Sequence, residues 1–251
     1  MGILVGATGV GGGSIMTPLL IGAFGVPPLI AIGTDVVFAA TIKLFGVLIH
    51  GRFGTIDWRL VGWIAMGSLP AALLALLIIA SVDPQTAVTV LSPILGIVLI
   101  ATALSMLFMA KRPNDSRANS ELASKTALAP GLMPRVKLVS LGAVLGTLVA
   151  WTSVGAGALG AAFLRWMIPS LSSARLVGTD LGHALVLSVL VGAGHWELGN
   201  VDYDLLLSLV LGALPGVAIG SVLAVKLPEV AVRRVLAGTL GVVGIKWLIG
   251  T

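Results

Sequence analysis

The chain has 251 residues, of which 57% are hydrophobic and only 10% are charged, with a net charge of +5 and no cysteine. A soluble domain carries about 25% charged residues, so this composition excludes soluble enzymes. The lack of cysteine excludes disulfide bonds, thiolate chemistry and cysteine-ligated metal. The excess of basic over acidic residues is typical of loops that face anionic lipid. We predict an all-α polytopic membrane protein.

Eight apolar segments follow one another along the chain, each long enough for the roughly 30 Å of bilayer hydrocarbon. Unsatisfied backbone groups in lipid cost several kcal/mol each, so the segments are expected to be helices. They cover residues 2–24, 27–49, 60–80, 86–109, 136–166, 174–195, 205–225 and 230–250. A polar stretch, residues 111–135, is the predicted cytoplasmic linker between a first transmembrane repeat, residues 1–110, and a second, residues 136–251.

The two halves share their motifs at a constant offset of 145, as between Gly33 and Gly178. Several separate motifs match in this single register, which indicates a tandem duplication. The matches are Gly33-Thr34-Asp35 with Gly178-Thr179-Asp180, His50 with His195, Gly54 with Gly199, Asp57 with Asp202, and GSLP at 67–70 with GALP at 212–215.

The positions of the basic residues distinguish two topologies. If all eight segments simply cross, five basic residues of the second half lie outside, against the positive-inside rule. If the glycine-rich first and fifth segments enter and return on one side, each half has three crossings, the halves are inverted, and these residues lie inside. The charge pattern favours inverted repeats with broken or re-entrant helices over eight simple crossings. The five residues are Arg165, Arg175, Lys226, Arg233 and Arg234.

A glycine-rich motif occurs near the start of each copy, TGVGGGS at 8–14 and TSVGAGA at 152–158. Glycine costs about 1 kcal/mol relative to alanine inside a helix, so the cluster predicts unwound backbone. Unwound backbone in a membrane is buried in protein or lines a cavity, and the N-termini of half-helices attract anions. We predict one anion site from the two motifs, with tight helix packing as the alternative. Only seven residues precede Thr8, whereas a long apolar stretch precedes Thr152, so the first copy is shortened or begins upstream.

Asp35 and Asp180 lie inside apolar segments. A carboxylate at mid-bilayer costs about 2.5 kcal/mol or more on insertion scales, which makes a functional role the default interpretation. Thr34 and Thr179 directly precede the two acids, and their hydroxyl groups are predicted to bind a substrate oxygen or a cation. A buried structural ion pair or a helix cap is the alternative for the acids.

Two further ionisable residues share a helix face with these acids. His183 lies one turn after Asp180 and can exchange a proton with it. Lys43 lies eight residues after Asp35, where it can pair with that acid or attract an anion. We therefore include both among the predicted coupling or gating groups.

The pattern His-x-x-x-Gly-x-x-Asp begins at His50 and again at His195. Each copy offers only two metal ligands, and inverted copies lie on opposite faces, so they cannot share one metal. Asp57 and Asp202 are instead predicted to cap the next helix, while the glycine permits the turn. No Ser/His/Asp set converges within one half and no HExxH occurs, so we predict no catalytic residue, metal or cofactor, with an intramembrane enzyme as a minor alternative.

Three stretches of the chain resemble the TauE/SafE sulfite-exporter permeases. They are TGVGGGS followed by Pro18-Leu19-Leu20, GTDLGHA at 178–184 and HWELGNVDYDLLLSLVLGALPG at 195–216. The resemblance covers the chain apart from the linker. It implies a multi-pass carrier of the bacterial inner membrane that exports or imports sulfite, organosulfonates or related small anions. It also implies an anion site lined by glycines, with hydroxyl groups as donors. These residues are Gly11, Gly12, Gly13, Gly155 and Gly157, with Thr8, Thr152 and Ser153.

We therefore expect a secondary transporter (permease) for a small anion such as sulfite, an organosulfonate or a related oxyanion, working by alternating access. Asp35 and Asp180 stand where many members of the family have serine, and this more acidic centre indicates a different anion or proton coupling. The coupling ion is a proton or sodium. A passive anion channel is the main alternative. No nucleic-acid partner is expected, and nothing in the sequence indicates an oligomeric state.

Overall fold

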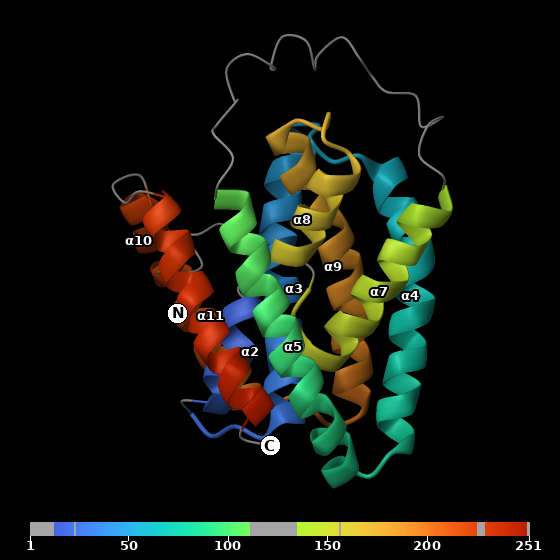
Figure 1. The fold of residues 1–251 in the computed structure, drawn as a ribbon, viewed down its shortest axis with the longest axis vertical. Helices are drawn as coiled ribbons and strands as arrows, with labels where there is room; N and C mark the ends of the chain where they lie inside the picture. The colour runs from blue at the N-terminus through green and yellow to red at the C-terminus, as the bar shows by residue number, and fades with distance from the viewer. Residues whose placement is uncertain (1–12, 23, 111–134, 156, 225–228, 250–251) are drawn as a thin grey trace.

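Helices account for almost all of the described part of the chain in the computed structural model, and no strand occurs in that part (Figure 1). The structure describes residues 13–22, 24–110, 135–155, 157–224 and 229–249. Its helices are α2 (Gly13–Gly22), α3 (Pro28–Arg52), α4 (Trp58–Ser81), α5 (Pro84–Ala110), α7 (Arg135–Thr152), α8 (Ala158–Met167), α9 (Ser173–Glu197), α10 (Tyr203–Ala224) and α11 (Glu229–Ile249). The linker up to residue 134 lies outside the described residues.

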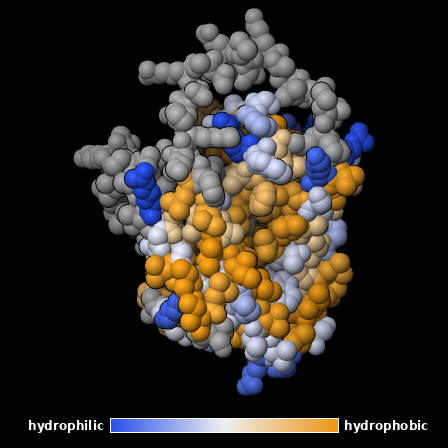
Figure 2. All heavy atoms as spheres, viewed as in Figure 1, coloured by the Kyte–Doolittle hydropathy of each residue, from blue (hydrophilic) through white to orange (hydrophobic). Residues whose placement is uncertain are grey.

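Five helical spans within the described ranges are long and apolar enough to cross a membrane. They are Pro28–Arg52, Trp58–Ser81, Pro84–Ser105, Arg135–Thr152 and Ser173–Glu197. Figure 2 shows mostly hydrophobic residues over the middle of the visible face and hydrophilic residues toward its two ends. The prediction of an all-α polytopic membrane protein is confirmed, while the number of crossings stays a prediction.

The helices repeat at the offset seen in the sequence. α8 begins and ends 145 residues after α2, and α9 begins and ends 145 residues after α3. α3 and α9 pack against each other and run in opposite directions (Figure 1). Gly33, near the start of α3, approaches Asn200 beyond the end of α9, and Gly178, near the start of α9, approaches Thr55 beyond the end of α3. This antiparallel relation of equivalent helices is the one that an inverted duplication predicts.

The loop after each of these two helices has the predicted capping geometry. Asp57 accepts hydrogen bonds from the backbone N–H groups of Arg59 and Leu60, at 3.1 and 3.2 Å. Asp202 accepts from Leu205 N at 2.9 Å in the equivalent loop. The glycine three residues before each aspartate has φ of 61° and 70°, which an L side chain rarely adopts. The structural role predicted for the His-x-x-x-Gly-x-x-Asp pattern is confirmed.

Helices α4 and α7 approach so closely that glycine is required between them. A Cβ on Gly67 of α4 would overlap the carbonyl oxygen of Val139, and a Cβ on Gly142 of α7 would overlap that of Ile64. Small residues at a membrane helix interface allow this contact between backbones. The position equivalent to Gly67 in the second copy is Gly212, where no described residue would lie within 4 Å of a Cβ.

Gly67→Ala is expected to lower the free energy of unfolding by about 1–3 kcal/mol, because the extra methyl group forces α4 and α7 apart. Gly212→Ala is the matched control, and it is expected to leave stability unchanged or to raise it by up to about 1 kcal/mol through helix propensity. Thermal unfolding of both purified variants in detergent checks this. Equal effects of the two substitutions would contradict the packing argument.

Candidate anion site

The second glycine motif interrupts the helix, as predicted. α7 ends at Thr152 and α8 begins at Ala158, with Ser153 at φ 58° between them. Thr152 and Ser153 are both buried, so this unwound backbone lies inside the protein. α8 begins after the break, and Leu159 and Gly160 of its first turn are buried. In the first copy, Gly13 begins α2. The predicted residues Thr8, Gly11 and Gly12 lie outside the described residues.

Asp35 joins the two copies at this break. Its Oδ2 atom accepts hydrogen bonds from Thr17 Oγ1 of α2, at 2.5 Å, and from Ser153 Oγ, at 2.9 Å. The Asp35 side chain is completely buried, and its Oδ1 atom has no hydrogen-bond partner in the part of the chain that the structure describes. A buried carboxylate is costly unless donors surround it, so the two hydroxyl groups stabilise the acid and fix the position of the break.

Asp180 has a different environment, although it occupies the equivalent position. Its side chain is 5% exposed, and its Oδ1 atom has no hydrogen-bond partner among the described residues. That oxygen faces α8, because a Cβ on Gly160 would overlap it. Asp180 therefore lies against the first turn of α8, immediately after the break.

Lys43 lies between the two acids in the centre of the α3–α9 pair. Its Nζ atom donates a hydrogen bond to Ser188 Oγ at 3.0 Å, and the lysine side chain is buried. Ser188 is the residue equivalent to Lys43 at the offset of 145, so the pair sits on the axis that relates the two copies. The positive charge of Lys43 acts on both Asp180 and Asp35, and more strongly on Asp180. One buried cation, Lys43, therefore acts by its charge on two buried acids.

His183 makes a polar pair that the other copy lacks. Its Nε2 atom lies 2.9 Å from Ser68 Oγ, and both side chains are buried. The equivalent residues in the other copy are Phe38 and Ala213, which belong to one apolar cluster. The two copies have therefore diverged at this contact.

The remaining threonines of the predicted site bond to backbone groups. Thr179 Oγ1 accepts from the N–H of Asp57, and Thr34 Oγ1 accepts from the N–H of Asp202, each at 3.0 Å. These symmetric bonds join each copy to the loop of the other. Thr152 Oγ1 donates to the carbonyl oxygen of Leu148, at 2.6 Å. Because these hydroxyl groups have local partners, we leave the three threonines out of the function proposed below.

A family model described as Sulfite exporter TauE/SafE matches residues 1–247. The chain belongs to the TauE/SafE family. It is 36% identical over 248 residues to "Probable membrane transporter protein YjnA" of Bacillus subtilis (strain 168), which covers 98% of this chain and 95% of that protein. It is 27% identical over 249 residues to "Probable membrane transporter protein YdhB" of the same organism, with the same coverage. No solved structure matches the chain.

Family and relatives together make this chain a multi-pass protein of a membrane transporter family, and they indicate a transporter rather than an enzyme. The resemblance seen in the sequence is confirmed. Among the described residues of this TauE/SafE protein, no three His, Asp or Glu side chains lie close enough to hold a metal ion together.

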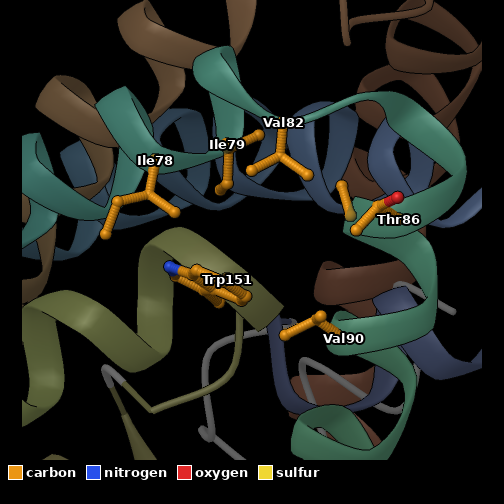
Figure 3. Close-up of a pocket in the computed structure, with 7 residues that line it drawn as sticks. Ile78, Ile79, Val82, Thr86, Val90 and Trp151 are labelled. Carbon is orange, nitrogen blue, oxygen red and sulfur yellow. The ribbon is translucent and has the colours of Figure 1, made fainter.

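The TauE/SafE chain also has an apolar pocket of about 160 Å³ at the hairpin between α4 and α5. Figure 3 shows Trp151 of α7 lying across from Ile78 and Ile79 of α4, with Thr86 and Val90 on α5. Apart from the Thr86 hydroxyl and the Trp151 indole N–H, this lining offers little to an anion. The buried polar cluster around Asp35, Lys43 and Asp180, rather than this pocket, is the candidate site.

Four residues of the cluster were not predicted from the sequence, namely Thr17, Ser68, Gly160 and Ser188. A signal was present for all four, because each stands where the other copy has a residue of different chemistry. For Ser68, Gly160 and Ser188 this is seen directly from the offset of 145. Their counterparts are Ala213, Ile15 and Lys43. Thr17 likewise corresponds to Ala162.

Proposed function

We propose that the chain is a secondary transporter for a small anion such as sulfite, an organosulfonate or a related oxyanion, in the bacterial inner membrane. The observation that carries the proposal is the buried helix break before α8, which lies beside the carboxyl groups of Asp35 and Asp180, and the charge of Lys43 acts on both of these acids. A helix N-terminus offers N–H groups and partial positive charge to an anion. Gly155 and Gly157, with φ of 133° and 137°, allow the backbone to turn there.

Alternating access is supported by the relation of the two copies. Broken helices and inverted repeats are a frequent plan of secondary transporters, with the substrate near the repeat interface. Here α3 and α9 form that interface, and the equivalent Thr–Asp bonds lie at its two ends. Asp35, Asp180, His183 and Lys43 are the proposed coupling or gating groups, with a proton or sodium as the coupling ion.

Counterflow in proteoliposomes tests the proposal. Vesicles loaded with unlabelled sulfite are diluted into labelled sulfite, and the assay is repeated with sulfate, thiosulfate, sulfoacetate and carboxylates. A carrier gives transient accumulation of label that depends on the loaded anion. Protein-free vesicles are the control. Equilibration without trans-stimulation would indicate a passive channel, and no flux of any anion would contradict the proposed function.

A further inference from the structure

The two equivalent acids, Asp35 and Asp180, differ in the described groups that contact their carboxyl oxygens. Thr17 supplies a hydroxyl group to Asp35, but its counterpart in α8 is Ala162, which has none. Asp180 instead extends its Oδ1 atom toward the α8 backbone at Gly160. The acid of the second copy therefore faces a helix terminus where the acid of the first copy faces hydroxyl groups.

The Asp180 Oδ1 atom lies against the first turn of α8. The N–H groups of Gly160 and Ala161 donate to the carbonyl oxygens of Gly155 and Gly157, at 2.9 Å each, so an anion would have to use the N–H groups that precede Gly160. The helix dipole adds partial positive charge there. The Asp180 oxygen is buried and accepts no hydrogen bond from a described group, while the charge of Lys43 acts on the carboxyl group. Gly160 permits the approach, whereas its counterpart Ile15 carries a branched side chain.

We propose that the Asp180 carboxylate and the transported anion compete for the first turn of α8, so that the anion binds when Asp180 is protonated. The inference rests on the proposed function and adds its coupling step. An anion and an ionised carboxylate repel strongly in a site of low dielectric. Binding of one anion therefore takes up one proton, release of the anion returns it, and the two move together. Gly160 is a positioning residue, because it lets the carboxylate reach the helix.

The other ionisable groups on the helices around Asp180 have other partners or lie at helix ends. On α3, Lys43 donates a hydrogen bond to Ser188. Asp35, on the same helix, accepts hydrogen bonds from two hydroxyl groups. On α9 itself, His183 pairs with Ser68 and His195 with the Ala150 carbonyl oxygen. Arg165 of α8 donates to the Leu171 carbonyl oxygen. The remaining groups on α3, α4, α7 and α9 lie in the first or last turn of their helices: His50, Arg52, Arg59, Arg135, Lys137, Arg175 and Glu197.

Calorimetry of the purified full chain tests the competition. The probes are methanesulfonate and sulfate, whose charges stay constant between mildly acidic and mildly alkaline pH. In wild type, affinity is expected to rise by up to about tenfold for each unit by which pH falls, with one proton taken up per anion. The proton number follows from titrations in buffers of different ionisation enthalpy. Asp180→Asn is expected to bind with pH-independent affinity and without proton uptake.

Asp204→Asn, at an exposed carboxylate in the first turn of α10, is the control, and it is expected to keep the proton uptake of wild type. Gly160→Ala provides a second route should Asp180→Asn fail to fold, because the added methyl group displaces the carboxylate and the pH dependence is expected to weaken. The proposed competition is overturned if anion binding to wild type does not depend on pH, or if Asp180→Asn retains proton uptake. Either result leaves the anion site intact. Failure of wild type to bind either probe or sulfite at any pH overturns the proposed function itself.

Discussion

Lys43→Met is expected to abolish transport and to lower the free energy of unfolding by about 1–3 kcal/mol at pH 8, because it removes a buried charge that acts on two buried acids and the hydrogen bond from that charge to Ser188. The Lys43 side chain is 4% exposed, and its charge acts on both Asp180 and Asp35. Methionine preserves most of the side-chain length, so the loss of charge rather than of packing dominates. Thermal unfolding in detergent and uptake in proteoliposomes measure the two effects.

A double variant separates the charge effect from a general disturbance. Adding Asp180→Asn to Lys43→Met removes one acid together with the cation, and it is expected to recover much of the stability without recovering transport. The penalty of Lys43→Met is also expected to shrink at pH 5, because a protonated carboxyl group needs no counter-ion. Wild-type stability of the single variant at pH 8 would show that Lys43 does not neutralise these acids.

Most of the scaffold could be predicted because it depends on local sequence. Apolar length gives the helices, and the break before Ala158 follows from the poor helix propensity of TSVGAGA. The caps at Asp57 and Asp202 follow from a short-range pattern of glycine and aspartate. The duplication was visible because several motifs share one offset, and the antiparallel packing of α3 and α9 agrees with the arrangement favoured by the basic residues.

The partners of the buried acids could not be predicted in the same way. Ser153 and Asp35 are 118 residues apart in the chain, so their contact depends on how the two copies pack and not on any spacing. Thr34 and Thr179 directly precede the acids, yet their hydroxyl groups point to the loop of the opposite copy. Adjacent residues on a helix face different directions, so adjacency to an acid was a poor guide to the site.

Comparison of the two copies supplies the information that spacing lacks. In a newly duplicated chain, equivalent residues make equivalent contacts in both copies. A position that later differs between the copies marks a local change of role. In this chain several of the differing positions lie in the polar cluster: Lys43 with Ser188, Thr17 with Ala162, and the Ser68–His183 pair with Ala213–Phe38. These differences lie on or against α3 and α9, the equivalent helices that pack against each other.

This asymmetry predicts that the Ser68–His183 pair can be replaced as a unit but not one residue at a time. Ser68→Ala is expected to cost about 1–3 kcal/mol, because it leaves the buried Nε2 atom of His183 without its partner at 2.9 Å. Adding His183→Phe recreates the Phe38–Ala213 contact, which packs in an apolar cluster of the other copy. The double variant is therefore expected to regain most of the lost stability, with a favourable coupling of about 0.5–3 kcal/mol.

A complete cycle of wild type, Ser68→Ala, His183→Phe and the double variant measures this coupling by thermal unfolding in detergent. His183→Phe alone is expected to cost less than Ser68→Ala, since a helical serine can turn its hydroxyl group to the carbonyl oxygen four residues earlier. Additive losses in the double variant would mean that the surroundings of the pair have diverged too far to accept the apolar arrangement. Recovery would show that both packings fit this bundle, so that the polar pair contributes something other than stability to the second copy.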